Sequence, residues 1–207
     1  SCGRAVDLDS SGSLLAGQTE YCSVHVWDVG SFSGQGWLSP PTPLLVTVQH
    51  QPATTVWVRF SPDDSMLVSA GVDGTARVWD IPSGEPRLVL DTGGGPVESA
   101  VWTPNGEHII TSSHDGVPRI WDVETGRLEA ELPAHGTWSH LAVTPDGRSL
   151  LTSADGVVRS WIIESAELVE AARARLTREL TDTECERYGI EPCPTIARTS
   201  ASPERPL

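Results

Sequence analysis

The sequence predicts an all-β fold made of repeated four-stranded antiparallel units, on three observations. One short pattern recurs four times, with spacings of 52, 42 and 40 residues, and ends at Trp27, Trp79, Trp121 and Trp161. In three copies an Asp-Gly pair stands six residues before the tryptophan. Asp-Gly between alternating apolar runs is a strong hairpin signal, because both residues tolerate positive φ. Finally, a period of about 40 to 45 residues that ends in Trp-Asp is typical of a β-propeller blade.

The first strand of each unit is predicted from an apolar run that ends in a proline turn. Proline presets φ at the second turn position, and the Asp or Asn that follows suits the rest of the turn. These runs and turns are Val56–Phe60 with Ser61–Asp64, Val97–Trp102 with Thr103–Gly106, and Leu141–Val143 with Thr144–Gly147. The second and third strands are expected on either side of Asp73-Gly74, Asp115-Gly116 and Asp155-Gly156.

The fourth strand is predicted after each Trp-Asp, where a Ser-Gly or Thr-Gly turn reverses the chain. Pro82–Glu85 is such a turn, and it leads into Arg87–Leu90. Each unit is therefore expected to be a four-stranded antiparallel meander. We place the units at about residues 4–29, 44–81, 87–123 and 127–163, which together form a propeller region over 1–163.

These repeats resemble the WD-repeat family of β-propellers, and the chain resembles the C-terminal segment of a bacterial multidomain WD-repeat protein. The resemblance implies a hydrogen-bond network in each blade, shared by a turn aspartate, a histidine before the first strand, a hydroxyl of the second strand and the tryptophan of the third. The residues that match are Ser69, Asp73 and Trp79 with His50, then Thr111, Asp115 and Trp121, then Thr152, Asp155 and Trp161 with His135. Gly93–Gly95 stands where the third repeat should have its histidine, and the first repeat keeps only Trp27 and Asp28.

The resemblance also implies that the ring is larger than this chain. The family closes its ring most often with seven blades, so about three blades are expected to be missing. A complete four-bladed ring and a ring assembled from two chains are the alternatives. After the last repeat, apolar spacing and capping residues predict a helical extension over 164–195, followed by a disordered tail over 196–207.

Charge and composition exclude several partner classes. The net charge is −14, from 28 acidic residues against 14 basic ones, and all the basic residues are arginines, which are scattered along the repeats and the segment after them. A nucleic-acid partner would need a concentrated basic stripe, so none is expected to bind directly. No apolar run approaches the ~18 residues of a membrane span, and no signal peptide is visible, so a cytoplasmic protein is expected.

No catalytic constellation emerges from the sequence. A nucleophile elbow and a phosphate-binding glycine loop are both missing, and the six histidines fall on strands, at structural positions or singly. Cys185 and Cys193 are read as ordinary cysteines, with a disulfide or a pair of zinc ligands as the alternatives. We therefore predict no enzyme activity, no cofactor and no metal.

The predicted function is a non-catalytic protein-interaction scaffold or sensor module of a larger cytoplasmic signalling protein, with an effector domain upstream in the same polypeptide. The alternative is a propeller enzyme or small-molecule receptor with a site in the central channel. That alternative needs polar groups on the inner strands, which read VWVRF, ESAVW and LAV and carry only Arg59 and Glu98 as charged residues. A structural repeat domain without a ligand is a third alternative.

Candidate residues for binding a protein or peptide follow from the resemblance. Partners of the family commonly contact the start of each inner strand and the residue before the turn aspartate. On this chain the candidates are Val72, His114, Ala154, Thr55, Glu98 and Trp138. Trp37 joins them, because it lies in a Gly-, Pro- and Ser-rich insert over 31–43 that lengthens the first spacing.

Overall fold

The computed structural model describes residues 5–19, 23–30, 44–48, 55–134, 136–137 and 140–163. All regular structure within these ranges is β, arranged in four antiparallel sheets, so the predicted all-β fold class is confirmed. The expected helical extension and tail over 164–207 lie outside the described residues. Within the described part of the chain, no helix is long and apolar enough to cross a membrane.

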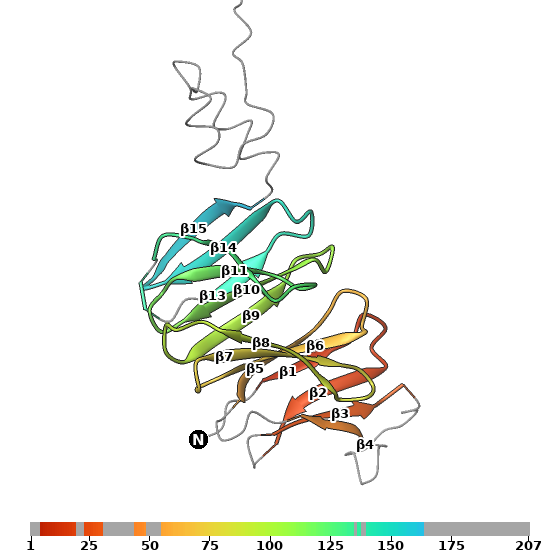
Figure 1. Cartoon of the computed structure of the whole chain (residues 1–207). Helices are drawn as coiled ribbons and strands as arrows, with labels where there is room; N and C mark the ends of the chain where they lie inside the picture. The colour runs from red at the N-terminus through yellow and green to blue at the C-terminus, as the bar shows by residue number, and fades with distance from the viewer. Residues whose placement is uncertain are drawn as a thin grey trace, which may run out of the picture. The chain divides into compact units, whose positions relative to one another are not determined.

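Each sheet is a meander whose strands pair in chain order (Figure 1). The first sheet contains β1 (Val6–Leu8), β2 (Leu14–Gln18), β3 (Val24–Asp28) and β4 (Leu44–Val48). The second contains β5 (Thr55–Phe60), β6 (Met66–Gly71), β7 (Thr75–Asp80) and β8 (Pro86–Asp91). The third contains β9 (Val97–Trp102), β10 (His108–Ser113), β11 (Pro118–Asp122) and β12 (Leu128–Glu131). The fourth has three strands, β13 (His140–Val143), β14 (Ser149–Ala154) and β15 (Val157–Ile162).

The fourth strand of each of the first three sheets follows Trp-Asp, as predicted, so the sheets start one strand later than the units placed at 44–81 and 87–123. The unit placed at 44–81 begins with β4, yet β4 pairs with β3 in the first sheet, with Val24 opposite Val48. Likewise Arg87–Leu90 lies on β8 of the second sheet, although the unit placed at 87–123 begins with it. The reason is the turn after Trp-Asp, which folds the chain back on the third strand, so that the chain crosses to the next sheet only after the fourth.

Neighbouring sheets pack through their first strands and bury apolar side chains between them. β1 packs against β5, β5 and β6 pack against β9, and β9 packs against β13 (Figure 1). The core between the first two sheets contains Val24, Val26, Val58, Leu67 and Trp79. Burial alternates at the start of β3, where Val24 and Val26 are buried, whereas β6 is buried along almost its whole length and therefore contributes side chains on both of its faces.

Polar bonds also join the first strands of neighbouring sheets. Asp7 on β1 accepts hydrogen bonds from Arg59 Nη1 at 2.7 Å and from the backbone N–H of Phe60 at 2.9 Å. Trp102 Nε1 on β9 donates to the carbonyl oxygen of Arg59 at 3.3 Å. These contacts fix the offset between sheets and thereby determine which loops lie beside one another.

The turns of the last three sheets lie at two ends, which we name for their sequences. The proline-turn end carries the turns after β5, β9 and β13, with Pro62, Pro104 and Pro145. The hairpin end carries the turns between the second and third strands of each sheet and the connections that lead into β9 and β13. Gly74 and Gly116 at this end have φ of 85° and 71°, a conformation that glycine adopts without strain.

Candidate protein-interaction face

A tryptophan and a hydroxyl group join the second and third strands in each of the last three sheets. The tryptophan Nε1 donates to the hydroxyl oxygen from Trp79 to Ser69 at 2.8 Å, from Trp121 to Thr111 at 2.8 Å and from Trp161 to Thr152 at 3.0 Å. All three hydroxyl residues are fully buried. Each bond satisfies a polar group that would be costly to bury alone, and it holds the two strands in register below the hairpin.

The first sheet lacks this bond because Gly17 occupies the position of the hydroxyl residue. Gly17 pairs with His25 on β3, as Ser69 pairs with Arg77 on β7. The Trp27 ring uses the space, since a Cβ on Gly17 would lie 3.0 Å from its Cζ3 atom. The His25 ring lies beside it, with ring centroids 5.5 Å apart.

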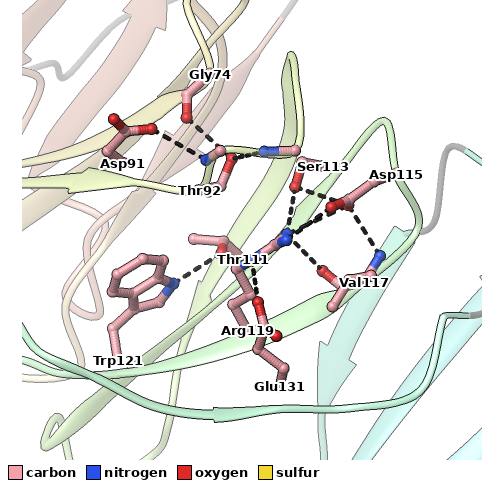
Figure 2. A network of polar contacts seen from close by, with 12 residues as sticks. Gly74, Asp91, Thr92, Thr111, Ser113, Asp115, Val117, Arg119, Trp121 and Glu131 are labelled. Carbon is pink, nitrogen blue, oxygen red and sulfur yellow. Dashed lines mark hydrogen bonds and ion pairs between the residues drawn. The ribbon is translucent and has the colours of Figure 1, made fainter.

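Arg119 is the centre of the polar network that supports the third hairpin (Figure 2). It is 8 % exposed. Its guanidinium donates to Asp115 Oδ2 at 2.7 Å and to Asp115 Oδ1 at 3.2 Å. It also donates to Ser113 Oγ at 3.0 Å and to Glu131 Oε1 at 2.9 Å. The arginine therefore ties the turn aspartate to β10 and β12.

The sequence interpretation missed this role of arginine, although a signal was present. In three repeats an arginine follows Asp-Gly after two intervening residues, as Asp73 with Arg77, Asp115 with Arg119 and Asp155 with Arg159. In the second sheet Arg77 Nη2 contacts Asp73 Oδ2 at 3.0 Å. The pattern Asp-Gly-x-x-Arg places both charges on one side of a hairpin, so it predicts an ion pair there.

The loop over 92–96 lies against the third hairpin and contains the position where the family resemblance implied a histidine. The backbone N–H of Asp115 donates to the Gly94 carbonyl oxygen at 3.2 Å, and that of His114 donates to the Pro96 carbonyl oxygen at 2.9 Å. A Cβ on Gly94 would lie 2.2 Å from Asp115 Oδ2. The close approach explains why glycine, and not a larger residue, stands here.

Burial and hydrogen bonds act in opposite directions on Asp115. Burial alone would raise its pKa, but the hydrogen bonds from Arg119 and from the Val117 N–H, together with the charge of Arg119, hold the pKa of Asp115 below its ordinary value. The hydrogen bond to Asp115 in turn raises the pKa of Arg119. Both groups are therefore charged at neutral pH, and the hairpin end has a fixed pattern of charge.

Side chains of the third and fourth sheets come together at the hairpin end. Glu98 on β9 is half-buried, and this burial raises its pKa even though His114 and His140 act on it in the opposite direction. His114 and His140 are exposed, and they stand on the third hairpin and at the start of β13. The second hairpin adds Val72, which is 44 % exposed. We call Val72, Glu98, His114 and His140 the hairpin-end cluster.

The other candidates from sequence are placed differently. Ala154 is 5 % exposed, so it offers almost no side-chain surface to a partner. It is the last residue of β14 and not a turn residue, and Gly136 covers it, since a Cβ on Gly136 would lie 2.8 Å from the Ala154 Cβ. Thr55 is the first residue of β5. Trp37, Trp138, His50, His135 and all four cysteines lie outside the described residues.

A pocket of about 300 Å³ opens at the proline-turn end between the inner strands β5, β9 and β13. Its lining is largely apolar and consists of Arg59, Phe60, Pro62, Val101, Trp102, Pro104, Leu141, Ala142 and Val143. Arg59 is the charged member, and it is already paired with Asp7 at 2.7 Å. Among the described residues, one group could hold a metal ion, and it lies elsewhere, on His108, Asp122 and Glu129.

Comparison with known proteins reveals three matches to one repeat family. The WD40 family, described as WD domain, G-beta repeat, matches residues 42–80, 84–122 and 126–161. The first two matches end on the third strands β7 and β11, and the last ends within β15. They cover more than half of the chain.

Curated relatives match over shorter stretches. The chain is 38 % identical over 81 residues to "Nuclear distribution protein PAC1" of Arthroderma benhamiae, which is 38 % of this chain and 15 % of that protein. It is 29 % identical over 87 residues to "Periodic tryptophan protein 2 homolog" of Schizosaccharomyces pombe, which is 42 % of this chain and 9 % of that protein. The chain thus matches a small part of each relative.

Proposed function

The chain belongs to the WD40 repeat family, and from this premise we propose that it is a non-catalytic scaffold that binds a protein or peptide at its hairpin end. WD40 repeats suggest such a scaffold in general. The family is generally non-enzymatic, which also favours a binding role. The specific face and the chemistry of the partner are our proposal.

The observation that supports this proposal is the hairpin-end cluster. Glu98 offers a half-buried carboxylate near His114 and His140, and Val72 adds an exposed apolar group on the neighbouring hairpin. A carboxylate in such surroundings attracts a cationic group more strongly than one in open water, because screening is weaker. A peptide with an arginine or lysine next to an aliphatic side chain fits this arrangement.

The supporting network makes this face a rigid one. Arg119 and Asp115 hold the third hairpin, and the Thr92 hydroxyl donates to the Gly74 carbonyl oxygen at 3.0 Å and so joins the second hairpin to the following loop (Figure 2). A preorganised surface loses less conformational entropy on binding. The bond from Thr92 to Gly74 joins turns of neighbouring sheets, so these short turns form one continuous surface.

The alternative site in the central channel is less well supported. Its pocket between β5, β9 and β13 is lined mainly by apolar side chains, and Arg59 is occupied by Asp7. A catalytic site needs several polar groups that converge on one point. Besides Arg59, the inner strands β5, β9 and β13 carry the titratable side chains of Glu98 and His140, and both belong to the hairpin-end cluster.

The wider setting stays a prediction of the sequence. It comprises a bacterial origin, the cytoplasm, an upstream effector domain that receives the binding signal, and the lack of direct nucleic-acid binding. The relatives named above are eukaryotic proteins matched over 81 and 87 residues, and their matched parts are small.

The test is a selection of binding peptides from a random library, followed by affinity measurement on two variants. Glu98→Gln with His114→Ala removes charge from the cluster, and Asp146→Asn changes an exposed carboxylate in the turn after β13 at the proline-turn end. We expect the cluster variant to lose at least about tenfold in affinity, equal to about 1.4 kcal/mol, and the control to bind as the wild type does. Peptides that bind both variants equally, with amide protection at the proline-turn end, would refute the proposed face.

A further inference from the structure

Three potential metal ligands meet on adjacent strands of the third sheet, away from the hairpin-end cluster. His108 is the first residue of β10, Asp122 is the last residue of β11, and Glu129 is on β12. One ligand atom of each lies within 4.8 Å of the others. His108 Nε2 is 2.9 Å from Glu129 Oε2. An imidazole nitrogen between two carboxylates is a donor set that suits zinc and related divalent ions.

Strand pairing brings these side chains together and holds them there. His108 is directly opposite Asp122 in the ladder between β10 and β11. On the other side of β11, Leu128 is opposite Trp121 next to a register shift, which places Glu129 at the end of the sheet beside Asp122. Ligands on three hydrogen-bonded strands need little rearrangement to surround an ion, so the entropy cost of binding is small.

Thr125 orients the carboxylate of Asp122. Its backbone N–H donates to Asp122 Oδ1 at 2.7 Å, and its hydroxyl donates to the same oxygen. Outer contacts of this kind, which fix the direction of a ligand, typically contribute tenfold or more to metal affinity. Thr125 belongs to the turn between β11 and β12, so the same turn positions Asp122 and starts the strand that carries Glu129.

The second sheet offers an internal comparison, because its register is the same. Met66 is opposite Asp80 there, and Arg87 follows Pro86, which is opposite Trp79. Asp80 forms an ordinary ion pair with Arg87 Nη1 at 3.4 Å. The third sheet thus replaces a methionine by histidine and an arginine by glutamate around the same aspartate. Where the second sheet has the ion pair between Asp80 and Arg87, the third sheet therefore has three potential metal ligands, two of which are carboxylates.

We propose that His108, Asp122 and Glu129 bind one divalent transition-metal ion, with zinc as the best fit to the donor set. The imidazole binds the ion through Nε2 in its neutral form, which is the form that offers a lone pair to a metal. Three protein ligands leave a fourth position open on a tetrahedral ion, where water or a side chain of a partner can bind. The site is independent of the hairpin-end cluster. The sequence predicted no metal, because the ligands are 14 and 7 residues apart and meet only through the strand register.

The experiment is a titration of the metal-free 207-residue chain with Zn²⁺, by calorimetry, beside a variant that carries His108→Met and Glu129→Arg. The variant reproduces the side chains of the second sheet, so it is expected to fold, which a far-UV circular dichroism melt verifies. We expect the wild type to bind one ion more than the variant, or to bind it at least about tenfold more tightly. Equal affinity and stoichiometry in the two proteins would overturn the proposal.

The chain has four cysteines, and cysteine is a strong zinc ligand, so zinc could also bind away from the proposed site. A second readout therefore has to locate the ion. Paramagnetic Co²⁺ should broaden the backbone amide signals of residues 108, 122 and 129 before those of other residues. Asp122→Asn is a second variant that keeps the shape and the acceptor for Thr125, and it should weaken binding without a change in the melting temperature of the metal-free protein. Broadening centred elsewhere, or an Asp122→Asn variant that binds as tightly as the wild type, would refute the site.

Discussion

The third and fourth sheets carry the same pattern, Asp-Gly-x-x-Arg, but they use it differently. In the third sheet Arg119 is buried and contacts Asp115 at 2.7 Å. In the fourth sheet Arg159 is exposed and forms no ion pair with Asp155 or any other described residue. Asp155 itself has a φ of 52°, whereas Asp115 does not have a positive φ. The same residues thus form a structural network in one hairpin and a plain turn in the other.

The difference follows from the length of the hairpin. Asp115 comes four residues after Thr111, but Asp155 comes three residues after Thr152. The fourth hairpin therefore lacks the residue that corresponds to His114, and Asp155 and Gly156 form a two-residue turn in which both have positive φ, as type I′ hairpins require. Ala154 consequently falls on the strand position of Ser113. One deleted residue removes both the ion pair and an exposed side chain from the candidate face.

The strongest test of this comparison is the removal of each arginine. Arg119→Met should destabilise the protein by about 3 kcal/mol, because it removes the charged hydrogen bonds that the buried guanidinium makes to Ser113, Asp115 and Glu131. Arg159→Met should change stability by less than about 0.5 kcal/mol, as is usual for an exposed residue, here one with no ion pair to another described residue. Chemical denaturation measures both.

Equal effects of the two substitutions would contradict the comparison. If Arg119→Met does not fold, the double variant Arg119→Met with Asp115→Asn removes the unpaired charge and should recover part of the stability. A failure of the double variant to recover any stability would show that Arg119 acts through its packing and not through the ion pair.

A second test changes the loop that contacts the third hairpin. Gly94→Ala adds a methyl group 2.2 Å from Asp115 Oδ2, so about 2 kcal/mol of destabilisation is expected from the forced shift. In an Asp115→Ala background the closest clash is gone, and only Ser113 Oγ, at 2.7 Å, remains close to the new methyl group, so the same substitution should cost less. A double-mutant cycle by thermal unfolding gives the coupling between the two positions. Independent, additive effects would mean that the contact with the carboxylate is not what requires glycine.

Much of the fold could be predicted from local patterns, while the sites could not. The proline turns, the Asp-Gly hairpins and the tryptophans are local signals, and they predicted antiparallel sheets of four strands. The fourth strand after Trp-Asp was predicted as well, and β8 with Arg87–Leu90 is that strand in the second sheet. Ala154 was named as a candidate because it precedes the turn aspartate, although the shorter spacing from Thr152 to Asp155 in the sequence already distinguishes it from His114. His108, Asp122 and Glu129 meet only through the strand register, so no motif indicated them.

A third test restores the missing residue in the fourth hairpin. Insertion of a histidine between Ala154 and Asp155 gives the hairpin the length of the third one. We expect Arg159 to pair with Asp155 and the stability to rise by up to about 1 kcal/mol, the usual range for a partly exposed ion pair. Nuclear magnetic resonance of the Arg159 side chain detects the pairing. If the insertion lowers stability and the guanidinium protons of Arg159 still exchange rapidly with water, the length of the hairpin is not sufficient to form the ion pair.

The smallest expected effect is the acid sensitivity of the third hairpin. The pKa of Asp115 is held below its ordinary value in the folded protein, so its contribution to stability is complete above the unfolded value of about 3.9 and is lost as the pH falls through the folded value. Below about pH 4, stability should therefore fall less steeply with pH in Asp115→Asn than in the wild type. Denaturation midpoints between pH 2.5 and pH 6 measure the slope, for which roughly half-unit steps suffice. Identical slopes in the two proteins would mean that the carboxylate has the same pKa in both states, so the ion pair with Arg119 would contribute nothing to the difference between the third and fourth hairpins.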